Sequence, residues 1–231
     1  MNIDINADLG EGAGFDAELM PLITSANVCC GLHAGGPSEI RVTLELAKQH
    51  GVAVGAHPGY ADRRNFGRNE MSLSRQELSD LCTYQIAGLD ALVRAAGLEL
   101  RYIKAHGALY NQACREEATA EAFVAAVEAW KLPLVGLPGS KLEVVARERG
   151  LMFVAEGFAD RRYRDDGSLV PRTEPNAFVA DPEEAARQVE RSIRERGVRT
   201  VCVHGDNPDA VAFAKAVRAA ILERGFQLTH F

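Results

Sequence analysis

The chain has 231 residues, of which 47% are hydrophobic and 25% are charged, close to the average of globular proteins. This composition excludes a disordered chain. The net charge of −6 argues against a nucleic-acid-binding protein, because such proteins are usually basic.

The cysteine content and the hydropathy indicate the compartment. The five cysteines are odd in number and form no C-x-x-C pair, which is typical of free thiols in a reducing compartment. No apolar stretch reaches the length of a membrane span. The sequence also does not open with basic residues followed by an apolar stretch, the pattern that marks a signal peptide. We therefore expect a soluble, cytoplasmic protein that contacts neither nucleic acid nor membrane.

Seven short apolar runs, each bounded by turn residues, predict buried parallel strands. In chain order they are Ile3–Ala7, Ile23–Cys29, Val52–Ala56, Tyr102–Lys104, Pro133–Gly136, Met152–Ala155 and Thr200–Val203, with a short eighth run at Gln227–Thr229. Helical patterns lie between most of them, and Ser74 with Glu77 and Ser140 with Glu143 each match a capping box. Strand–helix alternation along residues 1–231 predicts an α/β fold with a parallel sheet, and seven or eight units favour one closed, irregular barrel domain.

Polar side chains gather where these strands are predicted to end. Three runs end in a histidine followed by a turn, at His57, His106 and His204, and Lys104 is a charge within an apolar strand. The carboxyl ends of parallel strands are where ligands bind in such folds, so one shared site is expected. The other strand ends contribute Asn6, Asp8, Glu11, Asn27, His33, Glu156, Asp160 and Asp206. Carboxylates, imidazoles and an amine together suit acid–base hydrolysis or a metal ion that activates water.

Each candidate also has a structural interpretation. Asp8 could cap a turn, although its place in a strand-end D-x-G-E-G favours function. His33 could equally well cap a helix, and Arg161 could be surface charge or could bind a carboxylate or phosphate. The three strand-end histidines could be structural, but their equivalent positions favour a site. The chain has no G-x-x-x-x-G-K-[ST] loop for ATP and no G-x-S-x-G nucleophile elbow.

A series of motifs runs in order over nearly the whole chain. It consists of Asp4–Glu11, Ser25–Asn27 with Cys30–Gly35, Gly55–Pro58 with Asn65–Arg68, Lys104–Asn111, Phe158–Arg161 with Tyr163, Asp166–Arg172, and Cys202–Asp206. Together these motifs resemble the LamB/YcsF family. Three features depart from the family pattern. Gly36 stands where the family often has Asp, Ala105 stands where it has Pro, and the connection Arg196–Thr200 into the last barrel strand is shorter than usual.

The resemblance implies an irregular seven-stranded β/α barrel related to polysaccharide deacetylases and some glycoside hydrolases. It also implies the A component of a bacterial ATP-dependent 5-oxoprolinase, which opens the lactam of 5-oxo-L-proline to L-glutamate. ATP would then be a co-substrate, and separate B and C subunits would be partners. No residue is assigned to a metal on this basis, and the presence of a divalent metal stays open.

For this activity we expect a catalytic group and a substrate-binding group of residues. The catalytic residues are Asp8, His57, Lys104, His106 and His204. The substrate-binding residues are Asn6, Glu11, Asn27, His33, Tyr110, Asp160, Arg161 and Asp206. Asp8 or one of the three catalytic histidines would deprotonate water, and Lys104 with Arg161 would stabilise phosphate or oxyanion charge.

Two other functions stay open. Asp8 with two or three strand-end histidines would make an adequate Zn²⁺ or Mn²⁺ site, as in a metal-dependent amidohydrolase or deacetylase that acts alone. The chain could instead be a non-catalytic ligand-binding subunit, since it lacks a nucleotide motif. The density of titratable groups on one rim favours catalysis over binding alone.

Overall fold

The computed structural model describes residues 1–203 and 210–231, and within them seven parallel strands form a closed barrel. These strands are β1 (Asn2–Leu9), β2 (Ser25–Cys29), β3 (Ala53–His57), β4 (Leu100–Lys104), β5 (Leu134–Gly136), β6 (Phe153–Phe158) and β7 (Thr200–Cys202). They follow one another around the barrel in chain order, and pairing of β1 with both β7 and β2 closes the ring. A short β8 (Gln227–Leu228) pairs with Asn2 and Ile3, before the pairing of β1 with β7 begins. The predicted seven-stranded β/α barrel is therefore confirmed.

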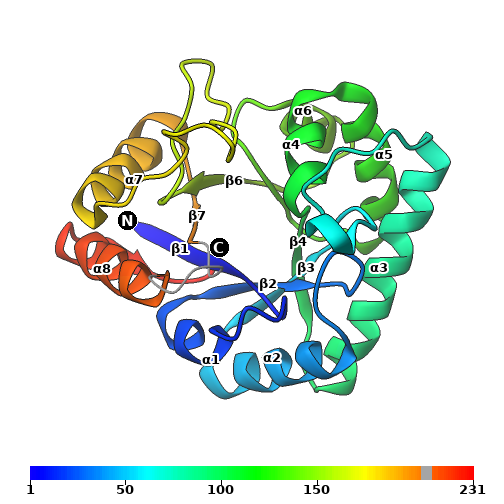
Figure 1. The fold of residues 1–231 in the computed structure, drawn as a ribbon, viewed down its shortest axis with the longest axis horizontal. Coiled ribbons are helices and arrows are strands. Elements are labelled where there is room, and N and C mark those ends of the chain that lie inside the picture. The colour runs from blue at the N-terminus through cyan, green and yellow to red at the C-terminus, as the bar shows by residue number, and fades with distance from the viewer. Residues whose placement is uncertain (204–209) are drawn as a thin grey trace.

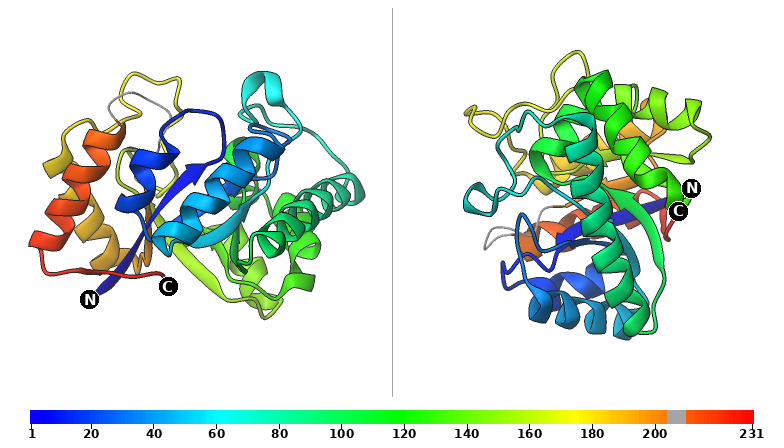
Figure 2. Two further views of the ribbon diagram at one scale, coloured as in Figure 1. Left: turned by 90° about the horizontal axis from the view of Figure 1, so that it is seen from below. Right: turned by 90° about the vertical axis from the view of Figure 1, so that its right-hand side faces the viewer.

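Helices surround the barrel on its outside (Figure 1). In the described ranges they are α1 (Asp16–Leu19), α2 (Pro37–His50), α3 (Arg75–Ala95), α4 (Gly107–Arg115), α5 (Glu117–Val127), α6 (Lys141–Glu148), α7 (Pro182–Arg196) and α8 (Ala210–Glu223). The main hydrophobic core fills the space between these helices and the outer faces of the strands. Among the helices described, none combines the length and the apolar character needed to cross a membrane. Both chain termini lie at the same end of the barrel (Figure 2).

Strand β1 explains why the barrel interior is polar. Apolar and polar residues alternate along this strand, yet most residues of both kinds are buried. Successive side chains of a strand point to opposite faces, so the isoleucines pack outward and Asp4, Asn6 and Asp8 face inward. Hydrogen bonds and an ion pair join these residues to inward side chains of other strands, which are Ser25, Asn27, Lys104, Glu156 and Thr200.

The amino-terminal end of the barrel is closed by apolar groups. Tyr102, Val135 and Val154 form a small core of their own, and Phe231 at the chain end packs against it. Gly55 makes room for the ring of Tyr102, because a Cβ at this glycine would lie 2.2 Å from a ring carbon. At the opposite, carboxyl end of the strands, Asp8 keeps 12% of its side chain exposed.

Two strands run two or more residues past their predicted carboxyl ends. Strand β1 runs to Leu9 instead of Ala7, and β6 runs to Phe158 instead of Ala155. An acidic residue normally marks the end of a buried strand, because an unpaired charge is costly to bury. Here Asp8 and Glu156 find partners across the barrel, so both strands continue through them.

The helix starts follow the predicted caps with one difference. At α3, Ser74 Oγ accepts a hydrogen bond from the Glu77 amide, and the Glu77 carboxylate accepts one from the Ser74 amide, which completes the box. At α6, Ser140 caps the Glu143 amide, but the Glu143 carboxylate binds the amide of Gly139 instead. The second capping box is therefore only half formed, because the preceding turn presents the glycine amide to the carboxylate.

Candidate functional site

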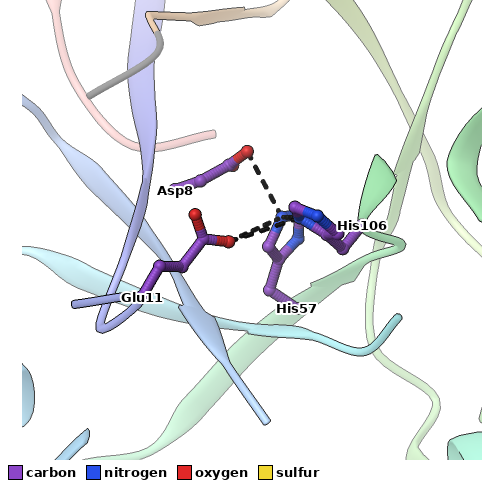
Figure 3. Close-up of side chains that lie close together, drawn as sticks. All are labelled: Asp8, Glu11, His57 and His106. Carbon is purple, nitrogen blue, oxygen red and sulfur yellow. Dashed lines mark hydrogen bonds and ion pairs between the residues drawn. The ribbon is translucent and has the colours of Figure 1, made fainter. Parts of the chain in front are cut away.

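Four side chains from three strand ends converge at the carboxyl end of the barrel (Figure 3). Asp8 is in β1, Glu11 follows β1, His57 ends β3, and His106 lies between β4 and α4. One ligand atom of each lies within 4.8 Å of those of the other three. His57 Nε2 is 3.3 Å from Asp8 Oδ2, and His106 Nδ1 is 3.3 Å from Glu11 Oε1. We call these four residues the acid–histidine cluster.

Backbone carbonyls fix the protonation pattern of both imidazoles. His57 Nδ1 lies 2.9 Å from the Lys104 carbonyl oxygen, and His106 Nε2 lies 2.8 Å from the Phe66 carbonyl oxygen. A carbonyl only accepts hydrogen bonds, so the nitrogen facing it carries the proton. In the neutral rings, His57 Nε2 and His106 Nδ1 are therefore unprotonated, and these two atoms lie 3.0 Å apart.

This arrangement fits a divalent metal ion. Two imidazole lone pairs at such a distance repel each other unless a proton or a cation lies between them. Two histidines and two carboxylates are a donor set that suits Zn²⁺, Mn²⁺ or Fe²⁺. Hydrogen bonds from the outer ring nitrogens to backbone carbonyls are the usual way in which proteins orient metal-ligating histidines.

A third imidazole supports the cluster from the side. His33 Nε2 donates to Glu11 Oε1 over 3.0 Å, and the His33 ring stacks on His106 with centroids 3.8 Å apart. Burial alone would raise the Glu11 pKa, but interactions with the neighbouring His106 and His33 imidazoles outweigh it and lower that pKa to about 2. Glu11 is therefore a carboxylate throughout the physiological range.

A buried cation lies below the cluster, inside the barrel. Lys104 Nζ is 2.7 Å from Glu156 Oε1 and 3.3 Å from Asp8 Oδ1. Burial alone would lower the Lys104 pKa, but Asp8, Cys202 and Glu156 outweigh it and hold that pKa well above its usual value. Two carboxylates, those of Asp8 and Glu156, face this one ammonium group, and Glu11 adds a further negative charge at the cluster. This excess of negative charge among the described side chains favours a further cation.

The sequence match extends from residue 3 to residue 231 and is to the LamB/YcsF family. The chain belongs to this family. A relative from Thermus thermophilus, named as the A subunit of 5-oxoprolinase, is 47% identical over an alignment of 250 residues that covers 100% of both chains. A relative of the same name from Neisseria meningitidis serogroup C is 46% identical and covers 98% of each chain.

Solved structures agree with this assignment. The lactam utilization protein from Thermus thermophilus superposes with a TM-score of 0.92 at 45% identity, over 100% of each chain. The catalytic domain of a peptidoglycan N-acetylglucosamine deacetylase from Eubacterium rectale has a TM-score of 0.55 at 12% identity, over 100% of this chain and 88% of that one. The second likeness concerns the fold alone, and it agrees with the expected deacetylase-like barrel.

The remaining predicted residues of this LamB/YcsF chain do not all lie together. Asn6 and Asn27 lie inside the barrel, where the Asn27 amide donates to Asn6 Oδ1 and to Asp8 Oδ1 over 2.7 Å each. Tyr110 is buried in α4, edge-on to Phe158, and burial together with the nearby Glu156 carboxylate holds the pKa of its hydroxyl well above the usual value. His204 and Asp206 lie outside the described residues.

Asp160 and Arg161 follow β6 and begin a long loop. Asp160 is buried, and its carbonyl accepts a hydrogen bond from the Val179 amide. The Arg161 guanidinium donates to the backbone carbonyls of Val170 and Ala177, so it holds the two arms of this loop together. Burial, aided by the nearby Arg172, lowers the Arg161 pKa to about 10.

Glu156 is a site residue to which sequence analysis assigned no role. It is fully buried, binds Lys104 and accepts a hydrogen bond from the Asn6 amide over 3.0 Å, and its second oxygen, Oε2, has no partner in the part of the chain that the structure describes. The same observation that drew attention to Lys104, a charge within an apolar run, applies to Glu156. It was placed on the rim because the strand was expected to end one residue earlier.

The burial of His33 predicts a pH-dependent stability. Burial lowers the His33 pKa from 6.5 to about 4, so between these values only the unfolded chain takes up the proton. The free energy of unfolding should therefore be highest above pH 6.5 and should fall as the pH drops toward 4. The loss due to His33 should reach up to about 3 kcal/mol. Urea unfolding of the metal-free protein at several pH values, compared with His33→Gln, measures this slope.

The glutamine variant should show a smaller loss of stability between pH 6.5 and 4 than the original chain. His50, an exposed histidine at the end of α2, supplies the matched control, since His50→Gln should leave the slope unchanged. Equal slopes for His33→Gln and the original protein would contradict the prediction.

Proposed function

We propose that this chain is the hydrolytic A component of an ATP-dependent 5-oxoprolinase, which converts 5-oxo-L-proline to L-glutamate. Two relatives that carry this name are 46–47% identical over essentially their whole length. The observation that carries the proposal within the structure is the acid–histidine cluster, because it brings two carboxylates and two oriented imidazoles to one point. The proposal includes a cytoplasmic location for the protein, because all five cysteines are free thiols.

The substrate explains why ATP and partner chains are required. A five-membered lactam resists water because its nitrogen donates electrons into the carbonyl group. Transfer of the ATP γ-phosphate to the lactam oxygen removes this donation and makes the ring carbon electrophilic. Water then adds to that carbon, the C–N bond breaks as the nitrogen takes up a proton, and a second water releases phosphate from the resulting acyl phosphate. This chain has no P-loop motif, so we assign ATP binding to a site shared with the B and C subunits or carried by them.

The chain's own residues suit the hydrolytic steps. Asp8 and His57 lie where they can take a proton from water, at the mouth of the barrel. Lys104, held next to Asp8 by Glu156, places a fixed positive charge where negative charge develops on oxygen. A divalent ion held by the acid–histidine cluster would add Lewis-acid polarisation and would lower the pKa of water. The Asn27 amide, which also donates to Asn6, helps to keep the Asp8 carboxylate in place.

The donor set of the cluster favours one further candidate, a metal-dependent amide hydrolase that works without partners. Two histidines with two carboxylates are sufficient for a hydrolytic metal centre. In this case no phosphate transfer takes place, and the metal alone must activate the amide bond. The two candidates differ in their need for ATP and for partner chains.

Reconstitution distinguishes these functions. The chain is mixed with candidate B and C subunits, 5-oxo-L-proline and ATP, and glutamate is measured with each component left out in turn. We expect glutamate only from the complete mixture. Amide hydrolysis by this chain alone, lost on chelation and restored by Zn²⁺ or Mn²⁺, would favour the second candidate. Undiminished glutamate formation by B and C without this chain would overturn the first candidate.

A further inference from the structure

The motif Asn65–Arg68 has no role in the proposed chemistry, yet it lies against the acid–histidine cluster. It belongs to the loop between β3 and α3 and begins at the last residue of the short 3₁₀ turn Arg63–Asn65. The Phe66 ring stands edge-on to His106 and His33, with centroids 5.6 Å and 6.1 Å away. The loop therefore covers the stacked imidazole pair.

Phe66 has a backbone conformation that is rare for its residue type. Its φ is +58°, in the left-handed region that bulky residues avoid. Hydrogen bonds hold it there, because its amide binds the Arg63 carbonyl over 3.2 Å and the next amide, of Gly67, binds the Asp62 carbonyl over 2.9 Å. Such strain persists where the surrounding structure fixes it, and it is concentrated at functional sites.

The left-handed conformation of Phe66 points its carbonyl group at the His106 ring. The Phe66 carbonyl oxygen lies 2.8 Å from His106 Nε2 and keeps the proton on that nitrogen. The other ring nitrogen, Nδ1, is left unprotonated toward His57 and Glu11. An ordinary φ at Phe66 would turn this carbonyl away, and the proton could then move to Nδ1, where it would block a ligand.

Gly67 allows the same loop to lie close to both imidazole rings. It also has a positive φ, of +63°, and a Cβ at this position would lie 2.8 Å from the His33 Cβ and 3.0 Å from the His106 Cδ2. The absence of a side chain lets the backbone approach both rings. The Gly67 carbonyl then accepts the Ala108 amide over 3.0 Å, which ties the loop to the start of α4 next to His106.

We propose that Phe66 is a positioning residue whose left-handed backbone sets the tautomer of His106 and so prepares the cluster for a divalent cation. The tautomer itself follows from hydrogen-bond geometry, and only its purpose rests on the proposed function. The proposal gives a role to the Asn65–Arg68 motif: its phenylalanine and glycine shape the backbone, and the ring of the former packs on the imidazoles.

Two substitutions separate the backbone from the ring. Phe66→Asn and Phe66→Val both remove the ring, but asparagine adopts a positive φ readily and β-branched valine does not. ¹⁵N NMR of histidine-labelled protein reports which ring nitrogen carries the proton, and His106→Gln identifies the His106 signals. We expect the Nε2-protonated form in the original chain and in Phe66→Asn, and loss of that preference in Phe66→Val.

Zn²⁺ affinity of the isolated protein, measured by calorimetry, is the second measurement. Phe66→Val should bind Zn²⁺ about 10–100-fold more weakly than Phe66→Asn, as for other groups that orient a metal-ligating histidine. Circular dichroism checks that both variants fold. An Nδ1-protonated His106 in the original protein would overturn the proposal even if Phe66→Val does not fold, and so would equal tautomers and affinities in both folded variants.

Failure of this proposal and failure of the proposed function are distinguishable. The NMR measurement uses neither substrate nor partner chains, so it reports on His106 whether or not the protein is a 5-oxoprolinase. A correct tautomer in a protein that forms no glutamate with its partners would contradict the function alone.

Discussion

Replacing Asp8 with asparagine is expected to lower glutamate formation by the assembled enzyme by about 10²–10⁴-fold. Asp8 Oδ1 faces the amide of Asn27 and the ammonium of Lys104, both donors, so the asparagine oxygen must take this side. The new NH₂ group then points at His57 Nε2, which lies 3.3 Å from Asp8 Oδ2. It would donate to the imidazole lone pair and occupy it. The variant therefore loses a base and blocks a metal ligand in one change.

Initial rates of glutamate release, measured with saturating partner chains and ATP, test this prediction. Metal bound by the purified variant, measured by elemental analysis, should fall together with the rate. The control is Asp80→Asn, since Asp80 is exposed on α3 and binds only the neighbouring Gln76 among the contacts described. A rate for Asp8→Asn equal to that of the control would remove Asp8 from the catalytic group.

Removal of the buried ammonium group should have the largest effect on stability. Lys104→Met keeps most of the side-chain volume but leaves Glu156, which has 0% exposure, without its cation. Breaking a buried ion pair from one side costs about 3–5 kcal/mol, because the remaining charge stays buried and unpaired. Urea denaturation at neutral pH measures the loss.

Two further variants show whether this loss comes from the pair itself. Lys104→Met combined with Glu156→Gln should recover much of the stability, since no uncompensated carboxylate remains at Glu156. The exposed pair of Lys141 and Glu117, 3.0 Å apart, is the matched control, and Lys141→Met should cost less than about 1 kcal/mol. Equal costs for Lys104→Met and Lys141→Met would mean that the interior charges are already neutralised without Lys104.

Local sequence patterns predicted most of the barrel. Apolar runs and helix caps are local signals, since strand formation and capping depend on residues close together in the chain. They located all seven barrel strands and the short eighth, with ends that differ by a few residues. They could not show that β6 continues through Glu156, because that depends on Lys104, which lies 52 positions earlier in the chain and on another strand.

The candidate site was predicted as a set of residues but not as an arrangement. Strand-end positions pointed to Asp8, His57 and His106, because parallel strands bring their carboxyl ends to one rim. Glu11 and His33 were expected to bind substrate, whereas the structure places Glu11 among four possible metal ligands and His33 in a stacked pair behind it. In His57 and His106, the ring nitrogen that carries the proton is set by the backbone carbonyls of Lys104 and Phe66. Neither contact can be predicted from composition or motif spacing.

The sequence by itself therefore determined the alternation of strands and helices, the family and the side chains available for chemistry, since these follow from local patterning and motif order. Only the tertiary structure decided which atoms meet. Closure of the ring by β1 brings Asp4, Asn6 and Asp8 into contact with residues up to 196 positions away. Inside that ring, pairing compensates the cost of burying charges, so residues that appear to interrupt strands become the polar interior and the acid–histidine cluster above it.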